Sequence, residues 1–269
     1  MNVRSAQAPL RRSERFATSL ERKATELAIT EFFVRYLQRR DSLSTEDLER
    51  LRTLKTEHAS FAPGEVIVPA GSSPNRSCMM LRGLSARSHP LVGRPDDRVI
   101  TALHVPGDFV DLHALLMAKL DHSIIAVGPA EVEFVDHAEL TEITENFPHL
   151  TRLLWMATVL DAAIHRQWLV AAASLRSSAH LAHLLCEIYT RLNAVGAASD
   201  QQFHLPLLQR ELADILGYSP IHVNRAVRDL RDRGLIRWIG ADITITDWKG
   251  LTLLARFDPS YLDLERARR

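Results

Sequence analysis

The sequence has few cysteines and no long apolar run. Its 269 residues include only two cysteines, Cys78 and Cys186, which lie far apart in the chain. This excludes a disulfide-stapled secreted scaffold and fits a reducing cytoplasm. No apolar run approaches the roughly 20 residues that a helix needs to span a bilayer, and the N-terminus lacks the apolar segment of a secretory signal. We therefore expect a cytoplasmic protein that makes no membrane contact.

An excess of charge of one sign is also missing. The 33 basic and 33 acidic residues cancel, so any affinity for DNA must come from a local patch. A hydrophobic content of 46% is enough for a sizeable core, and the length favours two domains over one. No nucleophile with a base, paired-carboxylate site or phosphate loop is recognisable. We therefore expect no enzyme activity.

The stretch Leu207–Ile245 has the pattern of two helices followed by a hairpin. Residues 207–216 place apolar side chains at helical spacing, and Gly217 can form a tight turn. Ser219 is a good N-cap residue, and Pro220 follows at the first helical position. This pattern predicts a second helix over 219–232, which ends before Gly234.

The second helix is predicted to be amphipathic. Val223, Val227 and Leu230 form a buried stripe, whereas the other side carries arginines. Two short β-rich runs at 235–239 and 243–246 predict a hairpin directly after the helix, which is the arrangement of a wing. A helical hairpin packed into a core is the alternative, but it would not need an arginine-bearing outer face. The pattern favours a winged helix-turn-helix.

The run GYSPIHVNR at Gly217–Arg225 resembles the C-terminal winged helix of Crp/Fnr-type bacterial transcription regulators. It is especially similar to a branch common in alphaproteobacteria. The resemblance extends from about Phe32 to Leu262. It implies an α+β fold, in which an N-terminal antiparallel β-roll like that of cyclic-nucleotide-binding proteins precedes a long dimerisation helix and the winged helix. It also implies a homodimer on an inverted-repeat DNA site, with RNA polymerase as a further candidate partner.

The second helix supplies the candidate DNA-binding residues. Arg225 is the first candidate for reading a base, because arginine can bond guanine O6 and N7 together. The family usually has glutamate where Ile221 stands, so the usual half-site sequence is not expected. His222 and Arg228 are assigned to phosphates, which position the protein without specifying sequence. The full set is Ser219, Ile221, His222, Asn224, Arg225 and Arg228.

Short β-rich segments separated by glycine or proline occupy residues 60–135, as expected for an antiparallel roll. Gly83 and Gly128-Pro129 are among the predicted turns, and Asp111–Leu120 is the predicted short helix within the roll. The predicted strands are Glu65–Val68, Cys78–Leu81, Arg98–Val105, Ile124–Val127 and Val132–Val135.

The predicted effector pocket keeps the scaffold of its relatives but not their ligand chemistry. In cyclic-nucleotide-binding relatives, a glutamate after a Gly-Asp-Phe motif binds ribose, and an arginine before serine or threonine binds the cyclic phosphate. Here Gly107–Phe109 is present, but Leu112 replaces the glutamate and His122 replaces the arginine. A neutral imidazole cannot make the bidentate contact, so we predict that cyclic-nucleotide binding is lost. The degenerate pocket comprises Asp111, Leu112, His113, His122 and Ser123.

No cofactor is predicted. Two cysteines cannot supply the four ligands of the iron–sulfur cluster that Fnr-type oxygen sensors hold. A metal or haem at the spaced histidines of the roll and a metal on one C-terminal helix are the alternatives, but packing explains both sets better. A thiol switch at either cysteine is a further alternative. The two sets are His104, His113 and His122, and His180, His183, Cys186 and Glu187.

Residues 149–175 contain neither glycine nor proline and predict one long helix with an apolar seam at 3.5-residue spacing. A lone long helix between two small domains needs a partner for its stripe, so we expect a dimer interface rather than an internal core. Trp155 and Trp168 are expected to anchor packing or the interface. The predicted interface residues are Leu150, Leu153, Ala157, Leu160, Ile164 and Trp168.

The predicted organisation has five parts. They are a mobile tail over 1–30, the β-roll over 31–147, the dimerisation helix over 148–175, the winged helix over 176–250 and a C-terminal tail over 251–269. A nucleic-acid-binding arm is the alternative for the first tail. The alternative for the whole chain is a sensor or protein-interaction module that lacks sequence-specific DNA binding.

Overall fold

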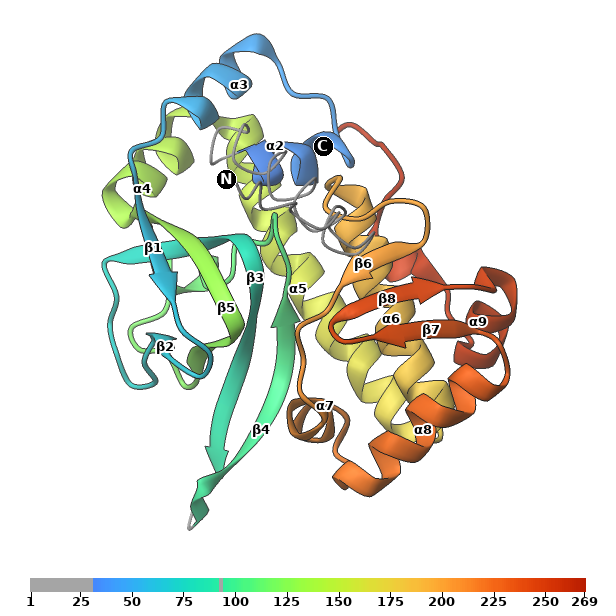
Figure 1. Cartoon of the computed structure of the whole chain (residues 1–269). Coiled ribbons are helices and arrows are strands. Elements are labelled where there is room, and N and C mark those ends of the chain that lie inside the picture. The colour runs from blue at the N-terminus through green and yellow to red at the C-terminus, as the bar shows by residue number, and fades with distance from the viewer. Residues whose placement is uncertain (1–30, 92–93) are drawn as a thin grey trace, which may run out of the picture.

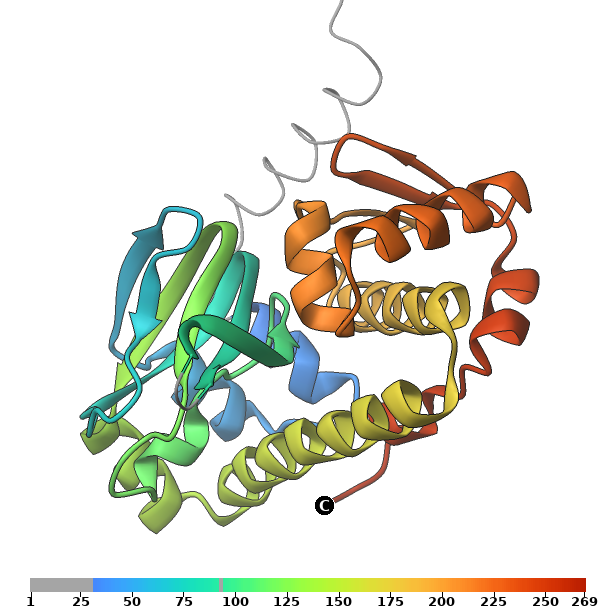
Figure 2. The ribbon, with the colours of Figure 1, turned by 90° about the horizontal axis from the view of Figure 1, so that it is seen from below.

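The computed structural model describes residues 31–91 and 94–269, so the predicted N-terminal tail over 1–30 lies outside the described residues. An N-terminal sheet and a C-terminal group of helices lie side by side, and helix α5 (Pro148–Ser174) runs along both of them (Figures 1 and 2). The predicted α+β class, with an antiparallel roll, a long helix and a C-terminal winged helix-turn-helix, is confirmed. No helix in the described ranges is long and apolar enough to cross a membrane.

The roll is one antiparallel sheet in the order β1-β5-β3-β4, and β2 pairs with β5. Strand β1 was not predicted, because its sequence TEHASF is mostly polar and only its pairing with β5 orders it. The strands are β1 (Thr56–Phe61), β2 (Val66–Val68), β3 (Arg76–Leu91), β4 (Arg94–His104) and β5 (Ser123–Asp136).

Two predicted turns of the roll are wrong. Gly83 lies inside β3 and Gly128 inside β5, where the sequence predicted that strands would end. Both glycines have positive φ, +74° and +76°, and the β3–β5 register shifts around Gly83. A side chain at Gly83 would place its Cβ 2.1 Å from the Pro129 carbonyl oxygen. The glycines therefore permit bulges that bend two long paired strands, rather than ending short ones.

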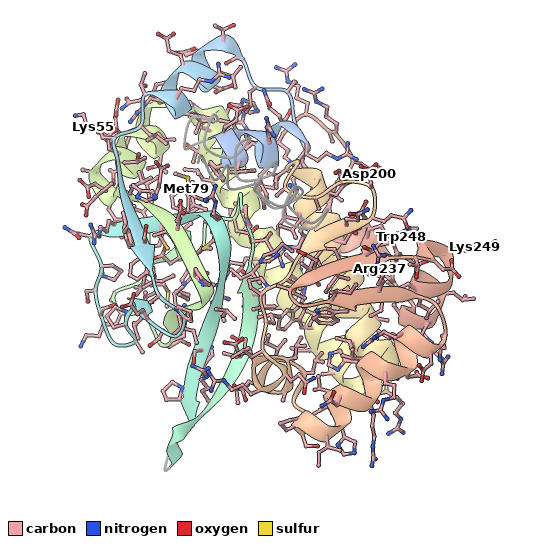
Figure 3. All side chains as sticks on the ribbon, in the orientation of Figure 1. Lys55, Met79, Asp200, Arg237, Trp248 and Lys249 are labelled. Atoms are coloured by element: carbon pink, nitrogen blue, oxygen red, sulfur yellow. The ribbon has the colours of Figure 1, made fainter. Side chains whose placement is uncertain are left out.

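Short helices close the end of the roll. Ser44 caps α3, and Asp47 completes a capping box. The helix predicted over residues 111–120 is only one 3₁₀ turn, because Asp111 bonds the Cys78 backbone N–H instead of capping a longer helix. Met79, labelled in Figure 3, is buried under these helices. The elements are α2 (Glu31–Gln38), α3 (Thr45–Arg52), η1 (Leu112–Leu115) and α4 (His137–Asn146).

The C-terminal part contains more structure than predicted. Strand β6 adds a third strand to the wing sheet, whose order is β6-β8-β7. The residues expected to form a tail include most of the last helix and a 3₁₀ turn. The chain then returns to the end of α2, where the Arg269 backbone N–H bonds Asp41 at 2.8 Å (Figure 1). The elements are α6 (Ser177–Ala194), β6 (Gln202–His204), α7 (Gln209–Leu216), α8 (Pro220–Asp232), β7 (Ile236–Ile239), β8 (Asp242–Ile245), α9 (Trp248–Ala255) and η2 (Pro259–Leu262).

One hydrophobic core crosses the boundary between the two parts. Leu84 and Ile125 of the sheet belong to the same buried cluster as Leu205 and Leu212 of the winged helix. Helix α7 packs against β4, and Figure 2 shows it between the sheet and α8. Burial of this shared apolar surface holds the winged helix against the roll of the same chain.

A buried polar network also joins the parts. Glu187 on α6 is fully buried and accepts hydrogen bonds from Trp168 of α5 at 3.1 Å and from the Tyr261 hydroxyl at 2.7 Å. Arg191, one turn later, donates to Glu187 and forms an ion pair with Asp108 in the turn after β4. Each carboxylate therefore has the partners that a buried charge requires.

Candidate nucleic-acid interface

The helix-turn-helix is built as its sequence predicts. Gly217 ends α7 in the left-handed region with φ +68°, and Ser219 then caps α8, with its Oγ accepting from the His222 backbone N–H at 3.4 Å. Val223 and Leu230 are fully buried against the neighbouring helices. Ala226 shares this stripe, whereas the predicted Val227 is only partly buried. The cap and the stripe together determine which side of α8 faces outward.

The outward side of α8 carries the predicted DNA-binding residues. Ile221 is 65% exposed, although it is a large apolar side chain, and the polar members of the set are also exposed. Ser219 Oγ lies 3.0 Å from the His222 ring Nδ1, so the cap residue also orients that imidazole. The exposed polar residues are Ser219, His222, Asn224, Arg225 and Arg228.

Two of these side chains differ in how the protein holds them. Among the described residues, Arg225 has neither a hydrogen-bond partner nor an ion-pair partner, because its neighbour Asp229 pairs with Arg233 instead. Asn224 exchanges two amide hydrogen bonds with Gln209 of α7, at 2.9 and 2.6 Å. Gln209 was missed from the sequence, since helical spacing within α7 does not show which residue faces α8.

The wing lies beside this surface. The Gly240 carbonyl accepts a hydrogen bond from the Trp238 indole at 3.1 Å, which stabilises the turn between β7 and β8. Arg237 of β7 is exposed, and Figure 3 shows it on the same side of the molecule as Lys249 of α9. These cations add basic character on two further elements, β7 and α9.

The residues predicted to form the effector pocket contact other residues of the same chain. Asp111 is fully buried, and Leu112 belongs to a hydrophobic cluster under the long helix. Ser123 accepts from the Ala70 backbone N–H at 3.0 Å, and the His122 ring lies 2.6 Å from a carboxylate oxygen of Asp121. The His122 ring also stacks obliquely between those of His113 and His89. The predicted pocket residues are thus neighbours. Ser123 Oγ and His122 Nδ1 have partners, whereas Asp111 Oδ2, His113 Nε2 and His122 Nε2 are buried without a hydrogen-bond partner among the described residues.

Burial keeps the histidines of this region neutral. It lowers the pKa of His113 to about 4 and the pKa of His104 well below its usual value, with further lowering by the nearby Arg87 guanidinium. Burial also lowers the pKa of His122. The same effect raises the pKa of the Asp111 carboxyl to about 6. A site composed of neutral rings offers little attraction to a phosphate anion.

Arg87 was missed by the sequence comparison with nucleotide-binding relatives. It lies on β3, is 4% exposed and pairs with Asp161 of α5 at 2.9 Å. One of its Nη atoms also lies 2.8 Å from the His165 ring Nε2. Its guanidinium therefore connects the sheet to the long helix.

The residues of the alternative metal set on α6 have other partners in the structure. His180 contacts Tyr218, His183 contacts the Ala255 carbonyl, and Glu187 belongs to the network described above. Cys186 is buried, and burial raises the pKa of its thiol to about 12; burial likewise raises the pKa of Cys78. Throughout residues 31–91 and 94–269, no three histidine, cysteine or acidic side chains are placed to hold a metal ion.

The residues predicted to form the dimer interface point into their own chain and are not exposed on its surface. Leu150, Leu153 and Ala157 pack into the chain's own core with residues of α2 and α4. Leu160 and Ile164 are also buried, and Trp168 donates to Glu187 inside the molecule. These residues are therefore not available to a second copy, because α4, β4, η1, η2 and α6 of the same chain pack against α5. The predicted members of the interface were Leu150, Leu153, Ala157, Leu160, Ile164 and Trp168.

The opposite face of α5 is apolar and exposed. Trp155 is 71%, Val159 51% and Leu169 72% exposed. Together with Ala162 and Arg166 they are separated alternately by four and three residues, which is the spacing of a two-helix seam.

Comparison with known proteins relates both halves of the chain to one family. Residues 179–254 match the family described as a Crp-like helix-turn-helix domain. The chain is 24% identical to the transcriptional activator protein anr of Pseudomonas aeruginosa over 214 residues, which cover 80% of this chain and 86% of the relative. It is 26% identical to the transcriptional regulatory protein btr of Bordetella pertussis over 155 residues, 58% of this chain and 64% of that relative.

Solved structures share the whole architecture. FixK2 from Bradyrhizobium japonicum is similar with a TM-score of 0.66 and 20% identity, over 75% of this chain and 98% of that one. CooA from Carboxydothermus hydrogenoformans, in a mutant form, has a TM-score of 0.55 and 16% identity, over 80% and 92%. The capped helix-turn-helix, the roll and these similarities agree: residues 179–254 form a Crp-like helix-turn-helix domain, and the findings together support a Crp/Fnr-type transcription regulator.

Proposed function

We propose that this regulator binds an inverted-repeat operator as a homodimer and reads it with the N-terminal half of α8. The observation that carries the proposal is Arg225, an exposed guanidinium on a capped helix with no partner among the described residues. An unpaired arginine on a rigid helix loses no internal ion pair when it bonds a guanine edge.

The neighbouring residues divide into base-reading and phosphate-binding groups. Ile221, exposed at the first turn of α8, suits apolar contact with a thymine methyl group. Asn224 is oriented by Gln209, so its amide reaches the groove only as part of that pair. His222, Arg228 and Arg237 of the wing suit phosphate contacts.

The exposed face of α5 supports dimerisation. Trp155, Val159 and Leu169 would bury large apolar surfaces against the same residues of a second copy, as a two-fold axis requires. A two-fold arrangement would direct two α8 helices at half-sites about one helical turn apart.

The proposal also includes the loss of cyclic-nucleotide contacts. Leu112 contributes to the hydrophobic core, His122 is held by Asp121, and Arg87 is paired with Asp161. These residues therefore offer no free carboxylate for a ribose and no free guanidinium for a cyclic phosphate.

The decisive experiment maps the DNA that the full chain selects. Purified protein would be incubated with fragmented genomic DNA and excess nonspecific DNA, and the retained fragments would be sequenced and footprinted. We expect a shared inverted repeat protected on both half-sites. Retention without any shared sequence, or no retention, would favour a sensor or interaction module that lacks sequence-specific binding.

A further inference from the structure

An amide pair connects the two helices of the helix-turn-helix on their exposed side. Gln209 is the first residue of α7, Asn224 lies in the middle of α8, and both side chains are exposed. The Gln209 Nε2 donates to the Asn224 Oδ1 at 2.9 Å, and the Asn224 Nδ2 donates to the Gln209 Oε1 at 2.6 Å. Two hydrogen bonds in opposite directions close a ring between the amides, so each amide fixes the orientation of the other.

Asn224 lies on the side of α8 that carries the candidate DNA-binding residues. It follows Ile221 by three residues and precedes Arg228 by four, so the three side chains lie along one stripe of the helix. Arg225, beside it, has no partner among the described residues, whereas Asn224 is already bonded to a second helix. The Asn224 amide would therefore meet DNA with part of its hydrogen-bonding capacity in use.

The pair occupies the edge of Asn224 that could recognise adenine. An asparagine recognises adenine when its carbonyl oxygen accepts from N6 and its N–H donates to N7. This contact requires the oxygen and the N–H that lie side by side on one edge of the amide, and a ring of two opposed amide hydrogen bonds uses the same edge. The groups that remain on Asn224, its second N–H and the second lone pair of Oδ1, diverge and cannot bond both adenine atoms.

The packing of α7 on α8 does not depend on this pair. Leu212 of α7 and Val223 and Ala226 of α8 are buried in the same hydrophobic cluster. Both amides are exposed, so water can replace either partner when the pair is broken. Loss of the pair should therefore change what α8 presents to DNA and leave the fold in place.

We propose that Gln209 is a specificity-determining residue that acts through Asn224: by pairing with the Asn224 amide, it prevents that amide from selecting adenine. Gln209 is a positioning residue, because it needs no contact with a base to exert this effect. An adenine can be bonded at both atoms only if the two hydrogen bonds of the pair are broken, so the exchange cancels most of the gain. The inference rests on the proposed function, because it requires α8 to lie in the major groove.

The pair should therefore narrow the set of residues that determine the operator sequence. Base preference in each half-site would come mainly from Arg225 and Ile221, and the base pair that faces Asn224 should vary among the bound sites. Removal of the Gln209 amide should free Asn224 and add a preference that the wild type lacks.

The test compares the DNA that full-length variants select from a random double-stranded library, followed by binding curves on sites that differ at one base pair. Gln209→Met removes the amide and keeps the length of the side chain, and Gln209→Ala is the second variant should the first not fold. Asn224→Ala and the double variant Gln209→Met/Asn224→Ala complete a double-mutant cycle. Arg210→Met is the matched control, because Arg210 is the next residue of α7, is exposed and has no hydrogen bond to α8 among the described residues.

We expect the wild type to show no preference for adenine at the base pair beside the one that Arg225 reads. In Gln209→Met, adenine should be favoured over the other bases by about tenfold at that position of each half-site. Asn224→Ala and the double variant should show no adenine preference. Arg210→Met should keep the wild-type base preferences even if its overall affinity falls, and the unfolding temperature of Gln209→Met should stay close to that of the wild type.

Three results would overturn the proposal: an adenine preference in the wild type that Gln209→Met loses, identical base preferences in the wild type and the Gln209 variants, or an adenine preference that persists in the double variant. The first would mean that the pair holds Asn224 ready for adenine, the second that the pair is a surface contact alone, and the third that Gln209 does not act through Asn224. A wild type that selects no shared sequence would contradict the proposed function itself, whereas a shared operator with any of these three results contradicts this inference alone.

Discussion

Asp229 pairs with Arg233 and not with Arg225: its Oδ1 lies 2.9 Å from the Arg233 Nε, one turn toward the C-terminus of α8. Asp229 is therefore occupied, and the Arg225 guanidinium is available to an external partner. An intrahelical ion pair between Arg225 and Asp229 would explain an arginine at this position without any DNA contact, and the structure does not contain that pair.

Replacing Arg225 by alanine should cost about 1–3 kcal/mol of binding free energy on the cognate operator and relax base preference at one position per half-site. The free energy of unfolding should change by less than about 0.5 kcal/mol, because no internal contact is lost. Salt-dependent binding curves on cognate and scrambled DNA measure both effects. Equal loss on the two DNAs would show that Arg225 does not read a base.

Arg228→Ala should weaken binding to cognate and random DNA alike. Because a phosphate contact releases counter-ions, the slope of log K against log salt should fall by about one per protomer. The same binding curves provide the measurement, with Arg225→Ala as the comparison. A loss confined to the cognate operator would assign Arg228 to base reading instead.

The two faces of α5 should respond differently to substitution. Val159→Glu on the exposed face should give a folded monomer, because a charge would be buried at the seam. Leu153→Ala on the buried face should lower the free energy of unfolding by about 2–5 kcal/mol and leave the association state unchanged. Light scattering and urea unfolding separate the two outcomes. A wild-type monomer at micromolar concentration, with and without DNA, would contradict the dimer.

Neither cAMP nor cGMP should bind in the roll at physiological concentration. Leu112 and His122 stand where a carboxylate and a guanidinium would be required, and Arg87 is already paired with Asp161. Calorimetry with each nucleotide tests this expectation. Micromolar affinity would mean that other groups replace the lost contacts.

Stability should rise with pH between about 4 and 6.5. The folded-state pKa of His113 is about 4, below its unfolded value of 6.5, so the unfolded state binds more protons in this window and stability falls as pH decreases. His104 and His122 shift in the same direction, whereas Asp111, with a folded pKa of about 6, opposes them.

Urea unfolding at pH 5.0 and 7.5, for wild type and His113→Asn, measures the contribution of one ring. The difference in unfolding free energy between the two pH values should be smaller in the variant. An unchanged difference would place the acid sensitivity elsewhere in the protein.

Local sequence was sufficient for the helix-turn-helix. Ser219 and Pro220 begin a helix and Gly217 ends the previous one through their own backbone preferences, so these features were predictable. The loss of the nucleotide-binding side chains at Leu112 and His122 was also readable, because it depends on residue identity. The strand boundaries were less predictable: Gly83 and Gly128 look like turn residues, but pairing with a neighbouring strand turned them into bulges.

Tertiary packing decided which face of α5 is buried and which is exposed. Both of its faces carry apolar residues at alternating spacings of three and four, so periodicity predicts two stripes without ranking them. The roll and α2 cover the stripe that contains Leu153, which leaves Trp155 and its neighbours exposed. The same holds for the Asn224–Gln209 pair, which is set by segments that meet only in the folded chain. The residues determined which elements form and which chemistry is available, and packing between distant segments decided which side chains are free to use it.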